Sequence, residues 1–139
     1  MTYLLDTNIV SAYTKRTMPG KLRDWLRVNE GASFLSVVSI AEMRHGLPGV
    51  DTPDHAVIAE RIAQTEIRFM HVTEPVDLDT LIRWKKLMGE LKSKNRTISC
   101  EDSLIAASAL AKGHAVVIDN VRHFKPAEDF GLNIVNPLD

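Results

Sequence analysis

The sequence predicts a single α/β domain built on a mostly parallel sheet of four to five strands. Short apolar runs alternate with longer segments of helical spacing, which is typical of a parallel sheet with helices on its faces. The 139 residues fit one domain, and a hydrophobic content of 45% is enough to bury a core. No internal repeat, linker or low-complexity tract interrupts the pattern, so we expect residues 1–139 to form one unit.

The first strand is expected at residues 3–5, a short apolar run at the start of the chain. Asp6, Thr7 or Asn8 can then cap a short helix, because side chains of these types accept hydrogen bonds from free backbone N–H groups. A second helical face follows over residues 22–29. The first junction between strand and helix therefore carries an acid.

The second strand is expected at residues 33–38, which are rich in β-branched and apolar side chains. Ser39 with Glu42 three residues later matches the capping-box pattern and predicts the start of the next helix. Residues 46–53 contain the chain's densest cluster of Gly and Pro, so we expect an exposed loop there.

Helix and strand continue to alternate in the middle of the chain. A helix is predicted from Thr52 or Asp54 to Phe69, followed by a short strand at residues 70–72. A turn at Glu74 and Pro75 then leads into a long helix over residues 76–92.

The last part of the chain begins with a polar loop at residues 92–97. Ser99 is expected to cap an alanine-rich helix that runs to Lys112 and ends at Gly113. Buried strands are predicted at residues 115–118 and 133–135.

Acidic side chains fall where predicted strands meet predicted helices: Asp6, Glu42, Asp102, and Asp119 with Asn120. Ligands of open parallel sheets gather outside the carboxyl ends of the strands, so acids at several such ends can converge. Converging carboxylates repel one another unless a cation lies between them. Because Mg²⁺ and Mn²⁺ prefer oxygen ligands, the pattern predicts a metal-dependent enzyme that acts on a phosphate ester.

Each acid also has a structural interpretation when it is taken alone. Asp6 is a good helix cap, Glu42 fits a capping box, and Asp102 lies in a first helical turn where the helix dipole favours an acid. Their shared position beside apolar runs favours a site, with Asp6 as its central ligand. Hydrogen bonds to the ligand carboxylates or to a bound water could come from Thr7, Asn8 and Ser103.

Composition and motifs exclude several other classes. The 17 basic and 18 acidic residues give a net charge of −1, so contact with a nucleic acid requires a local basic patch. A lone cysteine, Cys100, fits a reducing compartment such as the cytoplasm, and we expect neither an export signal nor a membrane span. The five histidines lack zinc-protease spacing, and the nucleotide-binding and serine-hydrolase motifs are missing.

Basic residues lie near the acid-bearing junctions and could guide a phosphate backbone, although each taken alone is more typical of a solvated surface charge or a local ion pair. The strongest candidates for substrate binding are Arg44, Lys94, Arg96 and Arg122. The others are Lys15, Arg16, Lys92 and Lys125.

Four segments in this order resemble the PIN-domain ribonucleases, and in particular the VapC-type toxins of bacterial toxin-antitoxin pairs. They are residues 4–8 (LLDTN), 39–46 (SIAEMRHG), 101–109 (EDSLIAASA) and 119–124 (DNVRHF). The resemblance extends to the closing residues 135–137 and so covers essentially the whole chain. Each piece is short, but the combination is specific.

The resemblance implies a PIN-like three-layer domain in which Asp6, Glu42 and Asp102 bind Mg²⁺ or Mn²⁺ for endonucleolytic cleavage of RNA. It also implies a homodimer and a cognate antitoxin protein that wraps the toxin and blocks its site. Operator DNA would be contacted only through the antitoxin, in a larger complex. A structured RNA such as tRNA is the substrate expected from the family.

The fourth acidic position departs from the family pattern, because Ile118-Asp119-Asn120 stands where many members have Thr-Arg-Asn or Thr-Arg-Asp. Either Asp119 or Asn120 could serve there, and His123 replaces an acid. Two rival functions remain at this point. One is a PIN-like module that binds RNA or protein without cutting, and the other is a phosphohydrolase with Asp6 as nucleophile.

Overall fold

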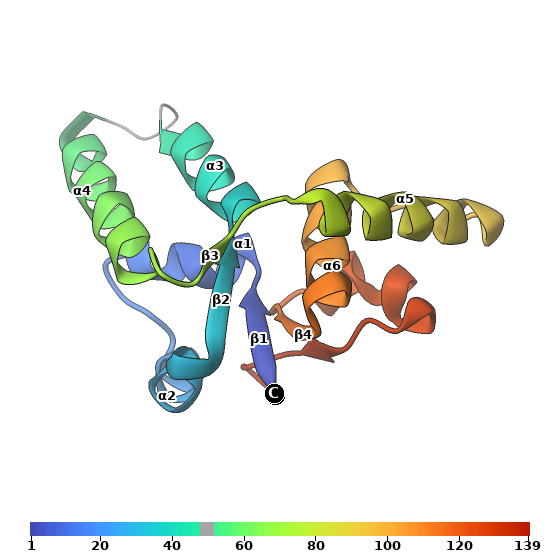
Figure 1. Cartoon of the computed structure of the whole chain (residues 1–139). Helices are drawn as coiled ribbons and strands as arrows, with labels where there is room; N and C mark the ends of the chain where they lie inside the picture. The colour runs from blue at the N-terminus through green and yellow to red at the C-terminus, as the bar shows by residue number, and fades with distance from the viewer. Residues whose placement is uncertain (48–51) are drawn as a thin grey trace.

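A computed structural model describes residues 1–47 and 52–139 of the chain. Its centre is a parallel sheet of five strands in the order β3-β2-β1-β4-β5 (Figure 1). The strands are β1 (Thr2–Leu5), β2 (Ser33–Ser36), β3 (Thr73–Glu74), β4 (His114–Val117) and β5 (Ile134–Val135). The predicted fold class is therefore confirmed, and β1 lies in the middle of the sheet.

Six α-helices connect these strands in the described part of the chain: α1 (Thr7–Val10), α2 (Gly20–Asn29), α3 (Val37–Gly46), α4 (Thr52–Arg68), α5 (Leu78–Ser93) and α6 (Cys100–Lys112). Short 3₁₀ segments follow several elements: η1 (Ser11–Thr14), η2 (Glu30–Ala32), η4 (Val121–His123) and η5 (Lys125–Phe130). These short turns were missed in the sequence, because they have no hydrophobic period long enough to detect.

Two apolar cores lie on opposite faces of the sheet. Leu4 and Val116 pack with α5, α6 and η5, whereas Leu5 and Val117 pack with α1, α2 and α4. Neighbouring residues of a strand point to opposite faces, which explains why adjacent residues belong to different cores. The three predicted layers are therefore helices, sheet and helices.

The start of α3 corrects one prediction. The strand β2 ends at Ser36, whose hydroxyl accepts a hydrogen bond from the Val38 N–H at 3.0 Å and caps a helix that begins at Val37. Ser39 is not the cap but a fully buried residue inside the helix. The β-branched Val37 and Val38 misled the prediction, because pairing within the sheet ends before them.

The third strand is also shifted. Residues 70–72, predicted as a strand, form a turn in which Met70 and His71 are exposed, and pairing starts only at Thr73, opposite Leu35. The turn and the two-residue edge strand are not distinguishable from an apolar run by period alone. The predicted loop at residues 46–53 lies partly outside the described residues.

The helices that frame the site begin and end at clear signals. The side chain of Asp77 accepts from the Thr80 N–H at 2.9 Å and caps α5, so this helix starts at Leu78 rather than at Val76. Helix α6 begins after Ser99 and ends at Gly113, as predicted. No helix among the described residues is long and apolar enough to cross a bilayer.

Candidate active site

The central acid of the site, Asp6, follows β1 directly. Its backbone N–H donates to the carbonyl of Val117 on β4 at 3.0 Å, which fixes the residue at the carboxyl edge of the sheet. Its side chain caps α1 by accepting from the Asn8 N–H at 3.3 Å. Only 4% of Asp6 is exposed, so the carboxylate lies in a nearly closed environment.

The pKa of Asp6 is raised to about 6, mainly by burial and in addition by the nearby negative charges of Asp102 and Glu42, while hydrogen bonds from the backbone of Asn8 and Thr7 lower it. Both acids therefore lie close enough to Asp6 to repel its charge. The three acids come from separate parts of the sequence and lie near the carboxyl ends of the strands. That they share one cation stays a prediction.

Glu42 is held toward Asp6 by the residue that follows Asp6. The Thr7 hydroxyl donates to Glu42 Oε1 at 2.6 Å and lies 3.0 Å from the Ser39 hydroxyl. Helix α3 packs beside α1, so Ser39 and Glu42, three residues apart, both face Thr7. Thr7 thus fixes one oxygen of Glu42.

Asp102 lies in the first turn of α6, where Ser99 caps the helix by accepting from the Asp102 N–H at 3.2 Å. Its carboxylate is 3.7 Å from Nδ1 of His123. The neighbouring Glu101 is exposed, whereas Asp102 is half-buried. The helix therefore turns Asp102, and not Glu101, toward the sheet edge.

Of the two candidates for the fourth position, Asn120 contacts a neighbour of Asp102, whereas Asp119 does not. The Asn120 amide nitrogen is 3.2 Å from Nε2 of His123, which in turn approaches Asp102. Asp119 is exposed, and its carboxylate accepts from the Asn120 backbone N–H at 2.7 Å. Asp102, His123 and Asn120 therefore form a continuous polar chain that the sequence did not reveal.

Ser103 contacts α5 instead of the acids. Its hydroxyl donates to the Cys100 carbonyl at 2.7 Å and accepts from the Trp84 indole at 2.8 Å. Both of its hydrogen-bonding partners thus lie away from Asp6, which contradicts the predicted support of the ligand carboxylates. The period of the helix places residues 102 and 103 on different sides.

The predicted substrate-binding cations differ in their surroundings. Arg44 is paired with Glu66 on α4, and Arg96 is paired with Asp129 at 2.7 Å. The Nε of Arg122 is 3.4 Å from the Asn120 amide oxygen, so Arg122 lies beside a candidate for the fourth position. Lys94, by contrast, is an exposed residue at the end of α5.

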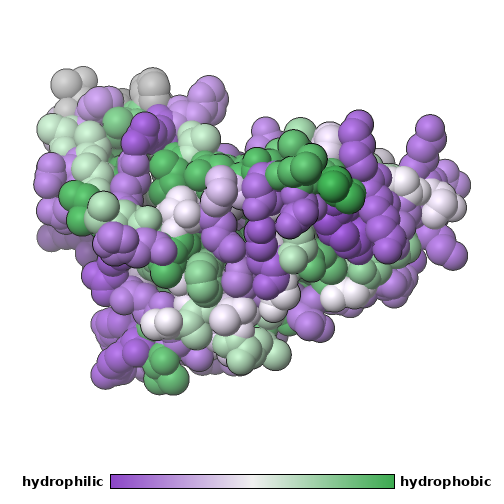
Figure 2. All heavy atoms as spheres, viewed as in Figure 1, coloured by the Kyte–Doolittle hydropathy of each residue, from purple (hydrophilic) through white to green (hydrophobic). Residues whose placement is uncertain are grey.

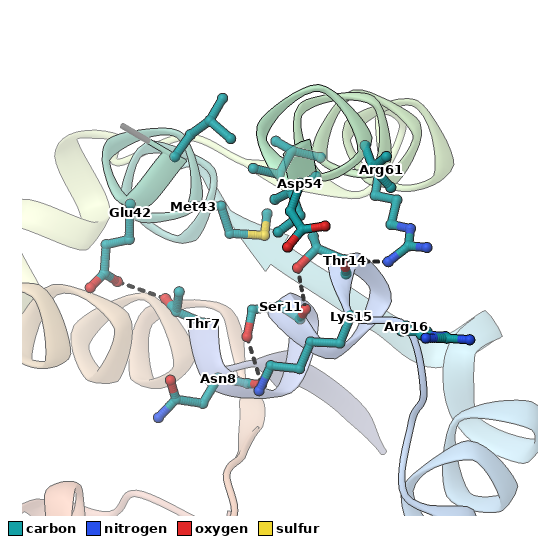
Figure 3. A pocket seen from close by; sticks show the side chains of 15 residues that line it. Thr7, Asn8, Ser11, Thr14, Lys15, Arg16, Glu42, Met43, Asp54 and Arg61 are labelled. Atoms are coloured by element: carbon teal, nitrogen blue, oxygen red, sulfur yellow. Dashed lines mark hydrogen bonds between the residues drawn. The ribbon is translucent and has the colours of Figure 1, made fainter. Parts of the chain in front are cut away.

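A groove opens beside Glu42, between α1 and η1 on one side and α3 and α4 on the other (Figure 3). Its volume is about 680 Å³, and Thr7 and Glu42 lie at one end. Lys15 extends along this groove toward Asn8, whereas Arg16 extends away from it.

The donors fit a hard divalent cation in their chemistry. All three acids supply oxygen. A bound cation would offset the burial of Asp6 and the neighbouring negative charges, which together raise its pKa. Within residues 1–47 and 52–139, no group of three or more His, Cys, Asp or Glu side chains is arranged to hold an ion as it stands. Binding would therefore require these side chains to draw together.

A sequence model of the PIN domain matches residues 3–128. The chain belongs to the PIN-domain family, which confirms the resemblance drawn from its motifs.

Two curated relatives are similar over most of their length. The VapC ribonuclease Y4jK of Sinorhizobium fredii is 29% identical, and the alignment covers 96% of each chain. The tRNA(fMet)-specific endonuclease VapC of Shigella flexneri is 25% identical over 88% of this chain and 89% of the relative.

Two solved structures share the fold. FitAcB from Neisseria gonorrhoeae superposes with a TM-score of 0.87 at 24% identity, covering 99% of both chains. VapBC-5 from Mycobacterium tuberculosis, a member of the VapBC family of toxin-antitoxin systems, superposes with a TM-score of 0.68 at 25% identity, covering 96% of this chain and 95% of that one.

Proposed function

We propose that this PIN domain, formed by residues 1–139, is a metal-dependent endoribonuclease that acts as the toxin of a toxin-antitoxin pair. The observation that carries the proposal is the buried carboxylate of Asp6, whose pKa is raised to about 6 by burial and by two further acids. Such a concentration of negative charge is unfavourable unless it serves a cation. The ribonuclease relatives support RNA as the substrate class.

Asp6, Asp102 and Glu42 would hold Mg²⁺ or Mn²⁺. When bound, the ion supplies Lewis-acid activation of a water molecule and neutralises charge on the phosphate. The side chain of Asn120, rather than that of Asp119, would complete the polar edge of the site, because it connects through His123 to Asp102.

The remaining residues of the site orient these ligands. Thr7 fixes one oxygen of Glu42 through its 2.6 Å hydrogen bond, and the Asn8 N–H fixes one oxygen of Asp6. Burial of Asp6 keeps bulk water from its carboxylate. Attack on the phosphodiester in line would leave a 5′-phosphate and a 3′-hydroxyl.

A structured RNA such as tRNA is the proposed substrate, supported by the printed specificity of the Shigella flexneri relative. Recognition of a loop in such an RNA would depend on shape and on unpaired bases. Arg122 lies beside Asn120 and is the predicted cation best placed to contact a phosphate. The enzyme would act in the cytoplasm.

The proposed protein partner is a cognate antitoxin, supported by the similarity to VapBC-5. Operator DNA would be bound through the antitoxin. We further propose a homodimer, because Leu78, Ile82 and Met70 are 71%, 60% and 59% exposed, an unusual exposure for apolar side chains. Figure 2 shows the apolar surface over the start of α5.

Cleavage of total RNA tests the proposal. The purified chain with Mg²⁺ should produce new ends carrying 5′-phosphates, and a chelator should abolish them while circular dichroism stays unchanged. Expression of the wild type should arrest growth, whereas expression of Asp102→Ala should not. Cleavage that persists in the chelator, or growth arrest by the folded variant, would contradict the metal mechanism.

The main alternative is a PIN module that binds RNA or protein but cuts weakly, and Asn120 in place of an acid favours it. Replacing Asn120 with Asp distinguishes the two functions. A large gain of cleavage in Asn120→Asp, starting from an inactive wild type, would support the binding module.

A further inference from the structure

The groove beside the acids has two chemically different walls. One wall, from α1 and η1, carries Asn8, Ser11 and the exposed Lys15. The opposite wall, from α3 and α4, carries the apolar side chains of Met43, Leu47, Val57 and Ile58. The volume of about 680 Å³ is within the range of small-ligand sites.

We propose that this groove binds one nucleotide of a single-stranded RNA segment next to the scissile phosphate, with its phosphate on Lys15 and its base against the apolar wall. The inference rests on the proposed function, because the groove ends at Glu42 and Thr7. A strand that reaches the acids from this side must pass along the groove.

The charges on the two walls determine which wall the phosphate of the nucleotide contacts. No salt bridge involves Lys15 among the described residues, so its ammonium group is free for a phosphate. On the opposite wall, Asp54 points toward the groove (Figure 3) and would repel a phosphate there. The carboxylate can instead accept hydrogen bonds from the amino groups of a base.

The apolar wall suits a base better than it suits solvent. Val57 is 47% exposed although it is apolar, and Met43, which also lines the groove, is a buried residue of the core that contains Leu5. Contact of a base with apolar or aromatic side chains does not depend strongly on its identity, so the site would tolerate several bases. An amphipathic peptide is the other occupant with matching chemistry, and the test below separates the two.

The test measures binding of fluorescent hexaribonucleotides of A, C and U by anisotropy in a chelator, so that no cleavage occurs. Lys15→Ala should weaken binding about fivefold and reduce the slope of log K against log salt by about 0.7, the value for one phosphate on a single strand. Lys86→Ala, which removes an equally exposed charge from α5, is the matched control and should change neither.

A second pair of variants tests the apolar wall. Val57→Glu should weaken binding about tenfold, because it places a third acid in the groove, in addition to Glu42 and Asp54. Ile67→Glu changes an even more exposed residue, 66% exposed on the same helix but outside the groove, and should have no effect. Both positions are solvent-accessible, so both variants should fold.

Backbone amide shifts in an NMR titration with the same RNA should map to Asn8, Lys15 and Val57. Shifts confined to the region of Arg96 and Arg122, or equal affinities in all four variants, would overturn the inference. So would binding of an amphipathic peptide in the groove without any binding of RNA. Metal-dependent cleavage could be observed while the groove residues show no NMR shifts and the groove variants bind RNA as the wild type does. In that case only this inference fails, and not the proposed function.

Discussion

At the scale of single residues, the buried carboxylate of Asp6 lowers the stability of the folded protein when it is charged. The folded protein binds a proton on Asp6 up to about pH 6, whereas the ordinary pKa is 3.8. The folded state therefore binds more protons between these values, and stability falls as the pH rises through this window. With about 1.4 kcal/mol for each pKa unit, the charged Asp6 costs about 3 kcal/mol at pH 7.

Replacing Asp6 with Asn should consequently stabilise the metal-free protein while it abolishes cleavage. We expect the free energy of unfolding at pH 7, from urea denaturation, to rise by about 1 to 3 kcal/mol. Below about pH 3 the difference should disappear, because Asp6 is then protonated in both the folded and the unfolded state. The exposed Glu101→Gln is the control, and a loss of stability in Asp6→Asn at pH 7 would contradict this account.

The residues of the site were predictable to different degrees. The sequence singles out Asp6, Glu42 and Asp102 because each stands beside an apolar run, and their role as ligands stays a prediction. The contact of His123 with Asp102, 3.7 Å apart in space and 21 positions apart in sequence, depends on how α6 and η4 pack. No local pattern encodes such a contact. The prediction that Ser103 supports the ligand carboxylates was wrong for the same reason, since its hydroxyl accepts a hydrogen bond from Trp84 on α5.

At the scale of elements, α6 positions Asp102 and depends on its two ends. Gly113 adopts a φ of +77°, in the left-handed region, and its backbone N–H donates to the Ala109 carbonyl. A side chain added there would meet no atom within 4 Å, so the cost of a substitution lies in the backbone alone. The end of the helix thus requires glycine for its conformation and not for space.

Gly113→Ala should lower the free energy of unfolding by about 1 kcal/mol, because a residue with a Cβ is less stable than glycine in the left-handed backbone conformation. Gly89→Ala, on an exposed face of α5 with no atom within 4 Å of the added carbon, should raise it by about 0.5 to 1 kcal/mol. Thermal unfolding measures both. Equal effects of the two substitutions would show that the positive φ does not constrain α6.

Element boundaries follow long-range pairing more than local preference. The sequence correctly placed α6, since Ser99 and Gly113 are strong local signals at its two ends. It extended β2 to residue 38, because Val37 and Val38 favour strands in isolation. The register with β1 and β3 ends the strand at Ser36 instead, and that register is a property of the folded sheet.

At the scale of the whole molecule, the near-neutral net charge conceals an uneven distribution. The acids gather at the carboxyl edge of the sheet, and cations such as Lys15 and Arg122 lie around them. Under the proposed function, a negatively charged RNA would approach along the basic surroundings and meet the acids only when a cation is bound. The strand order, with β1 in the centre, makes this arrangement possible.

The overall architecture was the most predictable level, because alternation of strands and helices permits few topologies. The groove was not predictable. Its walls come from α1, η1, α3 and α4, and their separation depends on how these helices pack across the sheet.

Calorimetric titration of the metal-free protein with Mn²⁺ tests the central claim most directly, namely that Asp6, Glu42 and Asp102 share one cation. The account predicts saturable binding that weakens by about tenfold or more in each of Asp6→Asn, Glu42→Gln and Asp102→Asn, and that stays unchanged in Glu101→Gln. Affinity that is the same in the wild type and in all three variants, or no binding by the wild type, would contradict it.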